Sequence, residues 1–138
     1  QDDLEHTTII EEMVQNVPES VFSSLQAGDL LFIDSSHVMK AGSDLYFLFF
    51  HVMPKLSAGV VVHLHDIFYP FEYPNEWLSE GRYWNEIYFL HAFLMYNNTW
   101  RIRLFNSYVG HEYSDFLDQH MPLSLKNTGG SIYIERVK

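Results

Sequence analysis

Two short segments of the chain carry side chains of the kinds that bind metals or move protons. In "GVVVHLHDIFYPFEYP" an apolar run leads into His63, His65 and Asp66, and in "FIDSSH" Asp34 and His37 follow a second apolar run. In open α/β sheets, ligands bind beyond the carboxyl ends of the strands. If the two runs are neighbouring strands, we expect Asp34 to converge with His65 and Asp66 at one rim of the sheet.

The two histidines of the longer segment have different interpretations. His63 and His65 are two residues apart, so both side chains point to the same face of a strand. His63 lies deeper in the apolar run and is interpreted as a hydrogen-bonded core histidine. His65 and Asp66 stand at the strand end and are candidate catalytic or metal-binding groups, because a neutral imidazole can ligate a metal or accept a proton and a carboxylate can orient it.

The residues of the shorter segment each have a structural and a functional interpretation. Asp34 either ends its strand as a turn or capping residue or presents a carboxylate to a metal or substrate. His37 either fixes the loop through a hydrogen bond or contacts a substrate. Ser35 and Ser36 are interpreted as turn hydrogen-bonders, because no Gly-x-Ser-x-Gly pattern marks a serine nucleophile around them.

An aromatic loop, "YPFEYPNEW", follows the second apolar run. Its two prolines stiffen the backbone, and such a loop can form the wall or lid of a pocket. Tyr69, Tyr73 and Trp77 are therefore candidate substrate-binding residues. The alternative is a loop that is packed down by its own aromatic side chains.

The elements that must position these groups follow from hydrophobic periodicity. Short apolar strands alternate with amphipathic helices, which is the signature of an α/β sheet. We expect strands at Thr7–Met13, Leu30–Asp34, Gly59–His65, Trp100–Tyr108 and Gly129–Lys138, and helices at Glu19–Leu25, Asp44–Met53, Glu80–Tyr96 and Tyr113–Gln119. The second and third strands are continuous apolar runs, which is typical of strands covered on both faces. Ser43 is the expected cap of the second helix.

Composition narrows the class of protein. A chain of 138 residues and 16.3 kDa, with 47% hydrophobic residues, fits a single globular domain with a real core. The net charge of −10 argues against a nucleic-acid partner, and no basic amphipathic helix or long apolar run indicates a membrane. The absence of cysteine excludes disulfides and thiolate metal sites. We expect a cytoplasmic protein with a small-molecule substrate.

One long stretch resembles a known family. The segments "GDLLFIDSSHVMKAGSDLYFLFFHVMPKLSAGVVVHLHDIFYPFEYPNEW" and "RYWNEIYFLHAFL" are similar to the second half of class I S-adenosylmethionine-dependent methyltransferases. The resemblance is closest to the branch of sugar and macrolide O-methyltransferases and cephalosporin-hydroxylase-like proteins. It implies a Rossmann-like, mostly parallel sheet in which "FIDSSH" and "GVVVHLHDI" end the fourth and fifth strands. Thr7–Met13 would be the third strand, and the last strand would be antiparallel and inserted beside the fifth.

The resemblance also implies cofactor residues. Gln15 and Asn16 fall where the family contacts the adenine ring of S-adenosylmethionine, and Asp34 and Ser35 lie at the same rim. The sequence offers no counterpart of the family's glycine-rich loop after strand one or of the acidic residue after strand two. We therefore expect the C-terminal portion of a methyltransferase-like fold, inactive by itself and binding the cofactor weakly or not at all. We also expect an exposed sheet edge that could pair with a second copy.

A divalent metal is the second cofactor that the resemblance raises. Relatives that bind a cation use an aspartate after strand four and an acidic pair after strand five. Asp34 and Asp66 match this pattern, but His65 stands in place of the second acid. Because magnesium prefers oxygen ligands, zinc, manganese or iron remain as candidate metals, and the alternative is His65 as a general base that deprotonates a substrate hydroxyl. We favour the base.

Three functions compete at this point. The first is S-adenosylmethionine-dependent O-methylation of a small-molecule or sugar hydroxyl. The second is a non-catalytic binding domain that keeps the same fold. The third is a metal-dependent hydrolase built on "HLHD", although Ile67 and Phe68 stand where such hydrolases carry a further aspartate and histidine.

Overall fold

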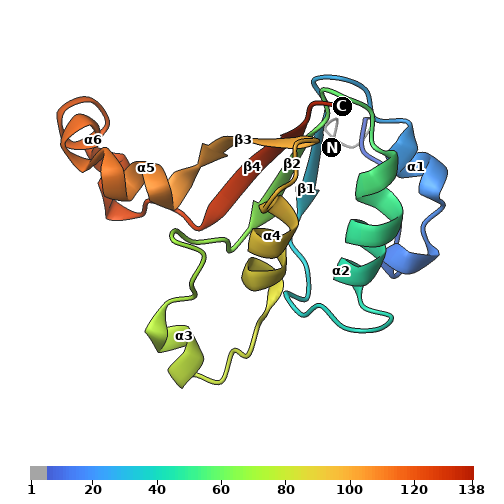
Figure 1. The fold of residues 1–138 in the computed structure, drawn as a ribbon, viewed down its shortest axis with the longest axis horizontal. Helices are drawn as coiled ribbons and strands as arrows, with labels where there is room; N and C mark the ends of the chain where they lie inside the picture. Colours follow the sequence, from blue (N-terminus) through green and yellow to red (C-terminus); the bar gives the residue numbers. More distant parts are fainter. Residues whose placement is uncertain (1–5) are drawn as a thin grey trace.

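The computed structural model describes residues 6–138 and contains one four-stranded mixed sheet (Figure 1). The strands lie in the order β1-β2-β4-β3 and are β1 (Leu30–Ile33), β2 (Val61–His65), β3 (Trp100–Phe105) and β4 (Ser131–Arg136). The helices are α1 (Glu19–Ser23), α2 (Asp44–Phe47), α3 (Asn75–Ser79), α4 (Glu86–Leu94), α5 (Asn106–Glu112) and α6 (Ser114–His120). No helix among these residues is long and apolar enough to cross a membrane.

The pairing of the strands sets where the site lies. β1 pairs with β2 in parallel, whereas β4 is antiparallel to both β2 and β3. The expectation of an antiparallel last strand inserted beside the strand that ends in "HLHD" is confirmed. The described sheet has one parallel and two antiparallel pairings instead of the mostly parallel sheet that the sequence predicts.

The predicted strand Thr7–Met13 is wrong. These residues form no strand and are exposed, with Ile9 at 73%. The β-branched residues of "TTII" have high strand propensity, but propensity yields a strand only where a neighbouring edge accepts the backbone hydrogen bonds. β1 is therefore an edge strand within residues 6–138.

One face of the sheet holds the core and the other is open. Val62, Leu64, Ile132 and Ile134 are fully buried beneath the helices. On the opposite face Leu30 and Phe32 of β1 are 52% and 53% exposed. The prediction that this strand is covered on both faces is therefore wrong, because no element within the described residues packs on its outer face.

The helix after β1 forms largely as its sequence predicts. Ser43 caps α2, since its hydroxyl accepts a hydrogen bond of 3.2 Å from the backbone N–H of Tyr46. The α-helix passes into a π-helical turn at Leu48–Val52 and a 3-10 turn at Met53–Lys55, which together carry the chain to the predicted end. The buried side of this element, which includes Leu45, Phe49 and Val52, packs on the core face of the sheet.

The long helix predicted at Glu80–Tyr96 is shorter than expected. α4 spans only Glu86–Leu94, because Gly81 has a φ of 84° and the side chain of Asn85 bonds to another loop. Two helices were not expected from the sequence. α3 interrupts the aromatic loop, and α5 replaces the end of the predicted strand Trp100–Tyr108, so that α5 and α6 form a helical arm between β3 and β4 (Figure 1).

Candidate functional site

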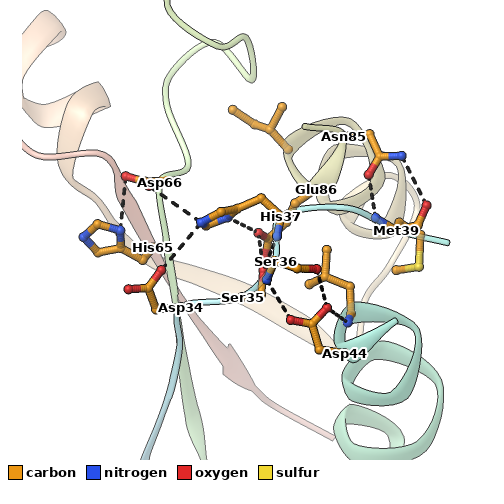
Figure 2. A network of polar contacts seen from close by, with 12 residues as sticks. Asp34, Ser35, Ser36, His37, Met39, Asp44, His65, Asp66, Asn85 and Glu86 are labelled. Atoms are coloured by element: carbon orange, nitrogen blue, oxygen red, sulfur yellow. Dashed lines mark hydrogen bonds and ion pairs between the residues drawn. The ribbon is translucent and has the colours of Figure 1, made fainter. Parts of the chain in front are cut away.

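The carboxyl ends of β1 and β2 meet because the two strands run parallel in register, from Leu30 opposite Val61 to Ile33 opposite Leu64. Two residues of the loops that follow these strands have left-handed backbone conformations: His37 after β1 and Asp66 after β2, each with a φ of 57°. Such a backbone costs a non-glycine residue about 1–3 kcal/mol and persists where the surroundings fix it. Both residues belong to the polar network drawn in Figure 2.

His37 and Glu86 form the buried centre of that network. His37 is 5% exposed and Glu86 is 1% exposed, and Nδ1 of the imidazole lies 2.7 Å from Oε2 of the carboxylate. The hydroxyl of Ser35 donates to the same oxygen at 2.9 Å and accepts from the backbone N–H of His37 at 2.9 Å. The Trp84 ring lies against the imidazole, with 4.1 Å between centroids. The histidine is therefore held on three sides.

The backbone places Glu86 under this loop. The N–H groups of Asn85 and Glu86 both donate to the carbonyl of His37, at 3.0 and 3.2 Å. The side-chain amide of Asn85 brackets Met39, accepting from its N–H at 2.6 Å and donating to its carbonyl at 3.2 Å. The first turn of α4 is thus fixed to the loop after β1.

The electrostatic setting of His37 favours its charged form. Burial alone lowers the pKa of His37, but the hydrogen bond that its ring donates to Glu86 and the negative charges of Glu86, Asp66 and Asp34 outweigh it, so the pKa is raised. Oε1 of Glu86 has no hydrogen-bond partner within the described residues. A buried carboxylate with one orphaned oxygen depends strongly on its remaining partners.

The rim residues meet around the other nitrogen of His37. Nε2 lies 3.5 Å from Oδ1 of Asp34 and 3.7 Å from Oδ2 of Asp66. Oδ1 of Asp66 lies 3.1 Å from Nδ1 of His65, but this nitrogen makes no hydrogen bond within residues 6–138. The structure therefore brings together Asp34, His65 and Asp66, as the sequence predicts, and links them through His37. The resulting series of contacts runs Glu86–His37–Asp66–His65.

His63 lies on the same face but outside this series. Its ring packs edge-on against Phe32, with 4.8 Å between centroids, and against Tyr133 at 4.2 Å. Nε2 of His63 has no hydrogen-bond partner within residues 6–138, so the predicted hydrogen bond is absent at that atom. Burial lowers the pKa of His63, the charge of His65 lowers it further, and Asp34 opposes this only in part. The lowered pKa therefore favours the neutral form of this packed ring.

The predicted adenine contacts lie at a hollow beside the rim. Gln15 is on the 3-10 turn Val14–Asn16 and lines a hollow of about 460 Å³ together with Ser36, Gly42 and Asp44. Its side chain donates to the carbonyl of Gly42 at 2.9 Å. Asn16 points instead to Glu12, at 3.1 Å. The structure places Gln15, but not Asn16, on the wall of this hollow.

The serines after β1 hold turns, as expected. The N–H and hydroxyl of Ser36 donate to Asp44 at 2.7 and 2.6 Å. Burial by itself raises the pKa of Asp44, but these hydrogen bonds and those from the backbone lower it more. Asp34 and Ser35 line a second, smaller hollow of about 170 Å³ that also includes Asp44. The two hollows share this aspartate.

The aromatic loop is mostly packed on itself. Tyr73 is 4% exposed and its hydroxyl accepts a hydrogen bond from the N–H of Ile87 at 3.2 Å. Trp77 packs edge-on against Phe68 and Trp84. Tyr69 is the most exposed of the three candidate substrate contacts, at 36%. For Tyr73 and Trp77 the self-packed alternative describes the structure, whereas Tyr69 remains accessible.

The predicted metal ligands do not form a metal centre. Within residues 6–138 no group of three histidine or acidic side chains is arranged to hold a metal ion. Asp34 contacts His37, with 3.5 Å between its Oδ1 and Nε2 of the imidazole. The donor set of Asp34, His65 and Asp66 therefore does not fit a cation in this arrangement, and no step is assigned to one.

Glu86 is the central residue to which sequence reasoning gave too little weight: it could reach the rim only if its helix begins there, and α4 does begin at Glu86. It lies 49 positions from His37 along the chain, so no local spacing pairs them. A weak signal exists: Glu86 falls three residues after Tyr83 and four before Leu90, on the apolar stripe predicted for that helix. An acid on a buried helical face requires a partner, and the partner here is an imidazole.

Comparison with known protein families gives a match in the first half of the chain. A family model described as a methyltransferase domain matches residues 2–67. The match covers β1, β2 and the rim residues Asp34, His37, His65 and Asp66, and it ends before the aromatic loop and Glu86. It supports a methyltransferase family for this segment, and the sheet is compatible with such a fold. Neither curated proteins nor solved structures gave a significant match.

Proposed function

We propose that the chain carries the acceptor-activating site of an S-adenosylmethionine-dependent methyltransferase that acts on a hydroxyl group of a small molecule or sugar. The observation that carries the proposal is the series Glu86–His37–Asp66–His65, located at the shared carboxyl rim of β1 and β2. The rim lies in the segment that matches a methyltransferase domain. Loss of the hydroxyl proton is the step for which such a site is suited.

His65 is the proposed general base. Its Nδ1 faces Asp66, which leaves Nε2 to accept the proton of an approaching hydroxyl, and its side chain is 43% exposed and accessible to a ligand. The imidazolium of His37 holds the other oxygen of Asp66, and Glu86 holds the imidazolium. Asp66, His37 and Glu86 are positioning residues in this scheme. Hydrogen bonds that are poorly aligned in a free enzyme often tighten in the substrate complex.

When bound, S-adenosylmethionine would supply an electrophilic methyl group for the deprotonated hydroxyl oxygen. On this chain the hollow lined by Gln15, Ser36 and Gly42 fits the adenosine part by size and offers it the side chains of Gln15 and Ser36 as hydrogen-bonding groups. Asp34 and Ser35 border the neighbouring hollow toward the rim. Since the sequence has no glycine-rich loop for the amino-acid end, we expect this chain alone to bind the cofactor weakly and to be inactive.

The test is transfer of labelled methyl groups from S-adenosylmethionine to a panel of sugars and small alcohols. It is run on this chain and on the longest reading frame that contains it. We expect His65→Gln to lower kcat by about 10²–10⁴-fold with little change in KM, which is the usual contribution of a positioned general base. The matched control is His51→Gln, because His51 also has an acidic neighbour, Glu19 at 3.7 Å, but lies on the helical turn Leu48–Val52.

Two results would overturn the proposal. If neither polypeptide transfers methyl groups to any hydroxyl acceptor, the non-catalytic binding domain becomes the better description. If transfer occurs and His65→Gln turns over as fast as the wild type, the base is another group. Calorimetry adds a separate check, since a micromolar dissociation constant for S-adenosylmethionine on this chain would contradict the expected weak binding.

A further inference from the structure

The helical arm between β3 and β4 contains an apolar hollow that the site described above does not use. The hollow has a volume of about 390 Å³ and lies between α5, α6 and the segment that leads into β4. Apolar side chains form most of its wall, and the polar groups come from neutral residues. The lining is Leu104, Asn106, Val109, Leu117, Met121, Ser124, Asn127, Thr128 and Gly129.

The register of the sheet places this hollow beside the proposed base. His65 pairs with Ser131, and Leu104 pairs with Tyr133, which itself pairs with His63. Paired residues of an antiparallel ladder share a face, so Leu104 and His65 lie on the same open face of the sheet. Gly129 lines the hollow and precedes Ser131 by two residues. The lining of the hollow therefore reaches the end of β4 that pairs with the last residue of β2.

Close packing fixes the shape of the hollow. Gly110 of α5 lies directly against Thr128, and a Cβ atom at Gly110 would overlap that side chain. On the other side of the arm, Tyr69 packs against Tyr108 with 5.1 Å between centroids, and its N–H donates to Ser107 at 2.8 Å. The arm is thus attached to the sheet and to the aromatic loop, so the hollow keeps a defined position relative to His65.

The chemistry of the lining selects the kind of ligand. No acidic, basic or histidine side chain contributes to the wall, so a phosphate or carboxylate would find no counter-charge there. A bare sugar could bond to the neutral polar residues of the wall, but its remaining hydroxyl groups would lie against Leu117, Val109 and Met121 without partners. A ring system is favoured instead, because the methionine thioether and the aliphatic side chains pack well on aromatic faces.

We propose that this hollow is the binding subsite for the apolar body of the methyl acceptor, an uncharged phenol or alcohol whose hydroxyl is directed toward His65. The inference rests on the proposed methyl transfer and narrows its substrate from any hydroxyl compound to one with an apolar ring or short hydrocarbon body. The arm between β3 and β4 then determines specificity, while the rim residues carry the chemistry.

The test uses 2-naphthol as the probe and the full chain without cofactor. A ligand of about eleven non-hydrogen atoms is expected to bind with a dissociation constant of about 0.1–1 mM. Methyl resonances of Val109 and Leu117 should shift on titration. Val109→Trp fills the hollow and should weaken binding by at least about tenfold. Val137→Trp is the matched control, because Val137 is exposed and lies outside the hollow.

The outcomes separate this inference from the proposed function. Three results would each overturn the subsite: 2-naphthol does not bind, its resonance shifts are confined to residues outside the hollow, or Val109→Trp binds it as tightly as the wild type. The resonance shifts require no variant, so they decide the matter even if Val109→Trp fails to fold. Methyl α-glucoside should cause no shifts at Val109, and shifts as large as those of 2-naphthol would overturn the inferred selectivity. If 2-naphthol binds in the hollow but no hydroxyl compound is methylated, the subsite stands and the proposed function fails.

Discussion

Glu86→Gln removes one charge from the buried centre of the site and leaves its shape nearly unchanged. The carboxylate is 1% exposed, and its Oε2 accepts from Nδ1 of His37 at 2.7 Å and from the hydroxyl of Ser35 at 2.9 Å. A glutamine oxygen can occupy the same position and keep both hydrogen bonds. Its amide group would then replace Oε1, which has no partner within residues 6–138.

Two effects set the size of the change. First, the hydrogen bond from His37 loses its negatively charged acceptor, and charge-assisted hydrogen bonds are roughly twice as strong as neutral ones. Second, a buried amide donor is left without an acceptor. We expect Glu86→Gln to lower the free energy of unfolding by about 1–3 kcal/mol at pH 6. This is less than the 3–5 kcal/mol typical of deleting one partner of a buried pair, because the substitution keeps the volume and the acceptor.

The effect should depend on pH through His37. In the native protein its pKa is raised above the value in the unfolded chain, so the added stability is complete below about pH 6.5 and is lost as the pH rises through the native pKa. One extra bound proton changes the free energy of unfolding by at most about 1.4 kcal/mol per pH unit. The wild type should therefore lose stability as the pH rises above about 6.5, and the variant should lose less.

Urea unfolding followed by far-UV circular dichroism, at several pH values, measures this directly. Trp84 fluorescence adds a local signal, since its ring lies 4.1 Å from that of His37. The imidazole resonances of His37 give its pKa, which should fall in Glu86→Gln. Glu72→Gln is the control, because Glu72 is an exposed acid that accepts a hydrogen bond from the hydroxyl of Tyr88. An unchanged His37 titration, or parallel pH profiles for wild type and variant, would refute the reasoning.

Two further predictions concern the fold around the site. Gly59→Ala should lower the free energy of unfolding, measured in urea, by about 2–4 kcal/mol, because Gly59 has a φ of +89° and the new Cβ would lie 2.5 Å from that of Ala27. Gly42→Ala is the control: Gly42 has a φ of +72° but open space around it, so the loss should be only about 1 kcal/mol. Equal losses in the two variants would show that the contact with Ala27 does not matter. Tyr73→Phe should lower the free energy of unfolding by about 1–2 kcal/mol and speed hydrogen exchange at the Ile87 amide, because this N–H in the first turn of α4 loses its acceptor. Unchanged protection of the Ile87 amide would contradict this role.

The local elements of the chain were largely predictable from sequence. The apolar runs that became β1 and β2, the Ser43 cap of α2 and the rim position of Asp34, His65 and Asp66 follow from periodicity, capping and the rule for parallel strands. These features depend on residues near one another in the chain. Their identification from sequence succeeded because short-range patterns encode them.

Tertiary structure alone decided what holds the site together. Thr7–Met13 has the composition of a strand but lies exposed, since whether a segment pairs depends on which edge is available. α4 begins at Glu86 rather than Glu80 because Asn85 bonds to a loop 46 positions away. The pairing of His37 with Glu86, and the hollow beneath the arm, arise from contacts between distant segments. The sequence alone thus indicates which groups could react, and the three-dimensional packing determines which of them are charged, oriented and within reach.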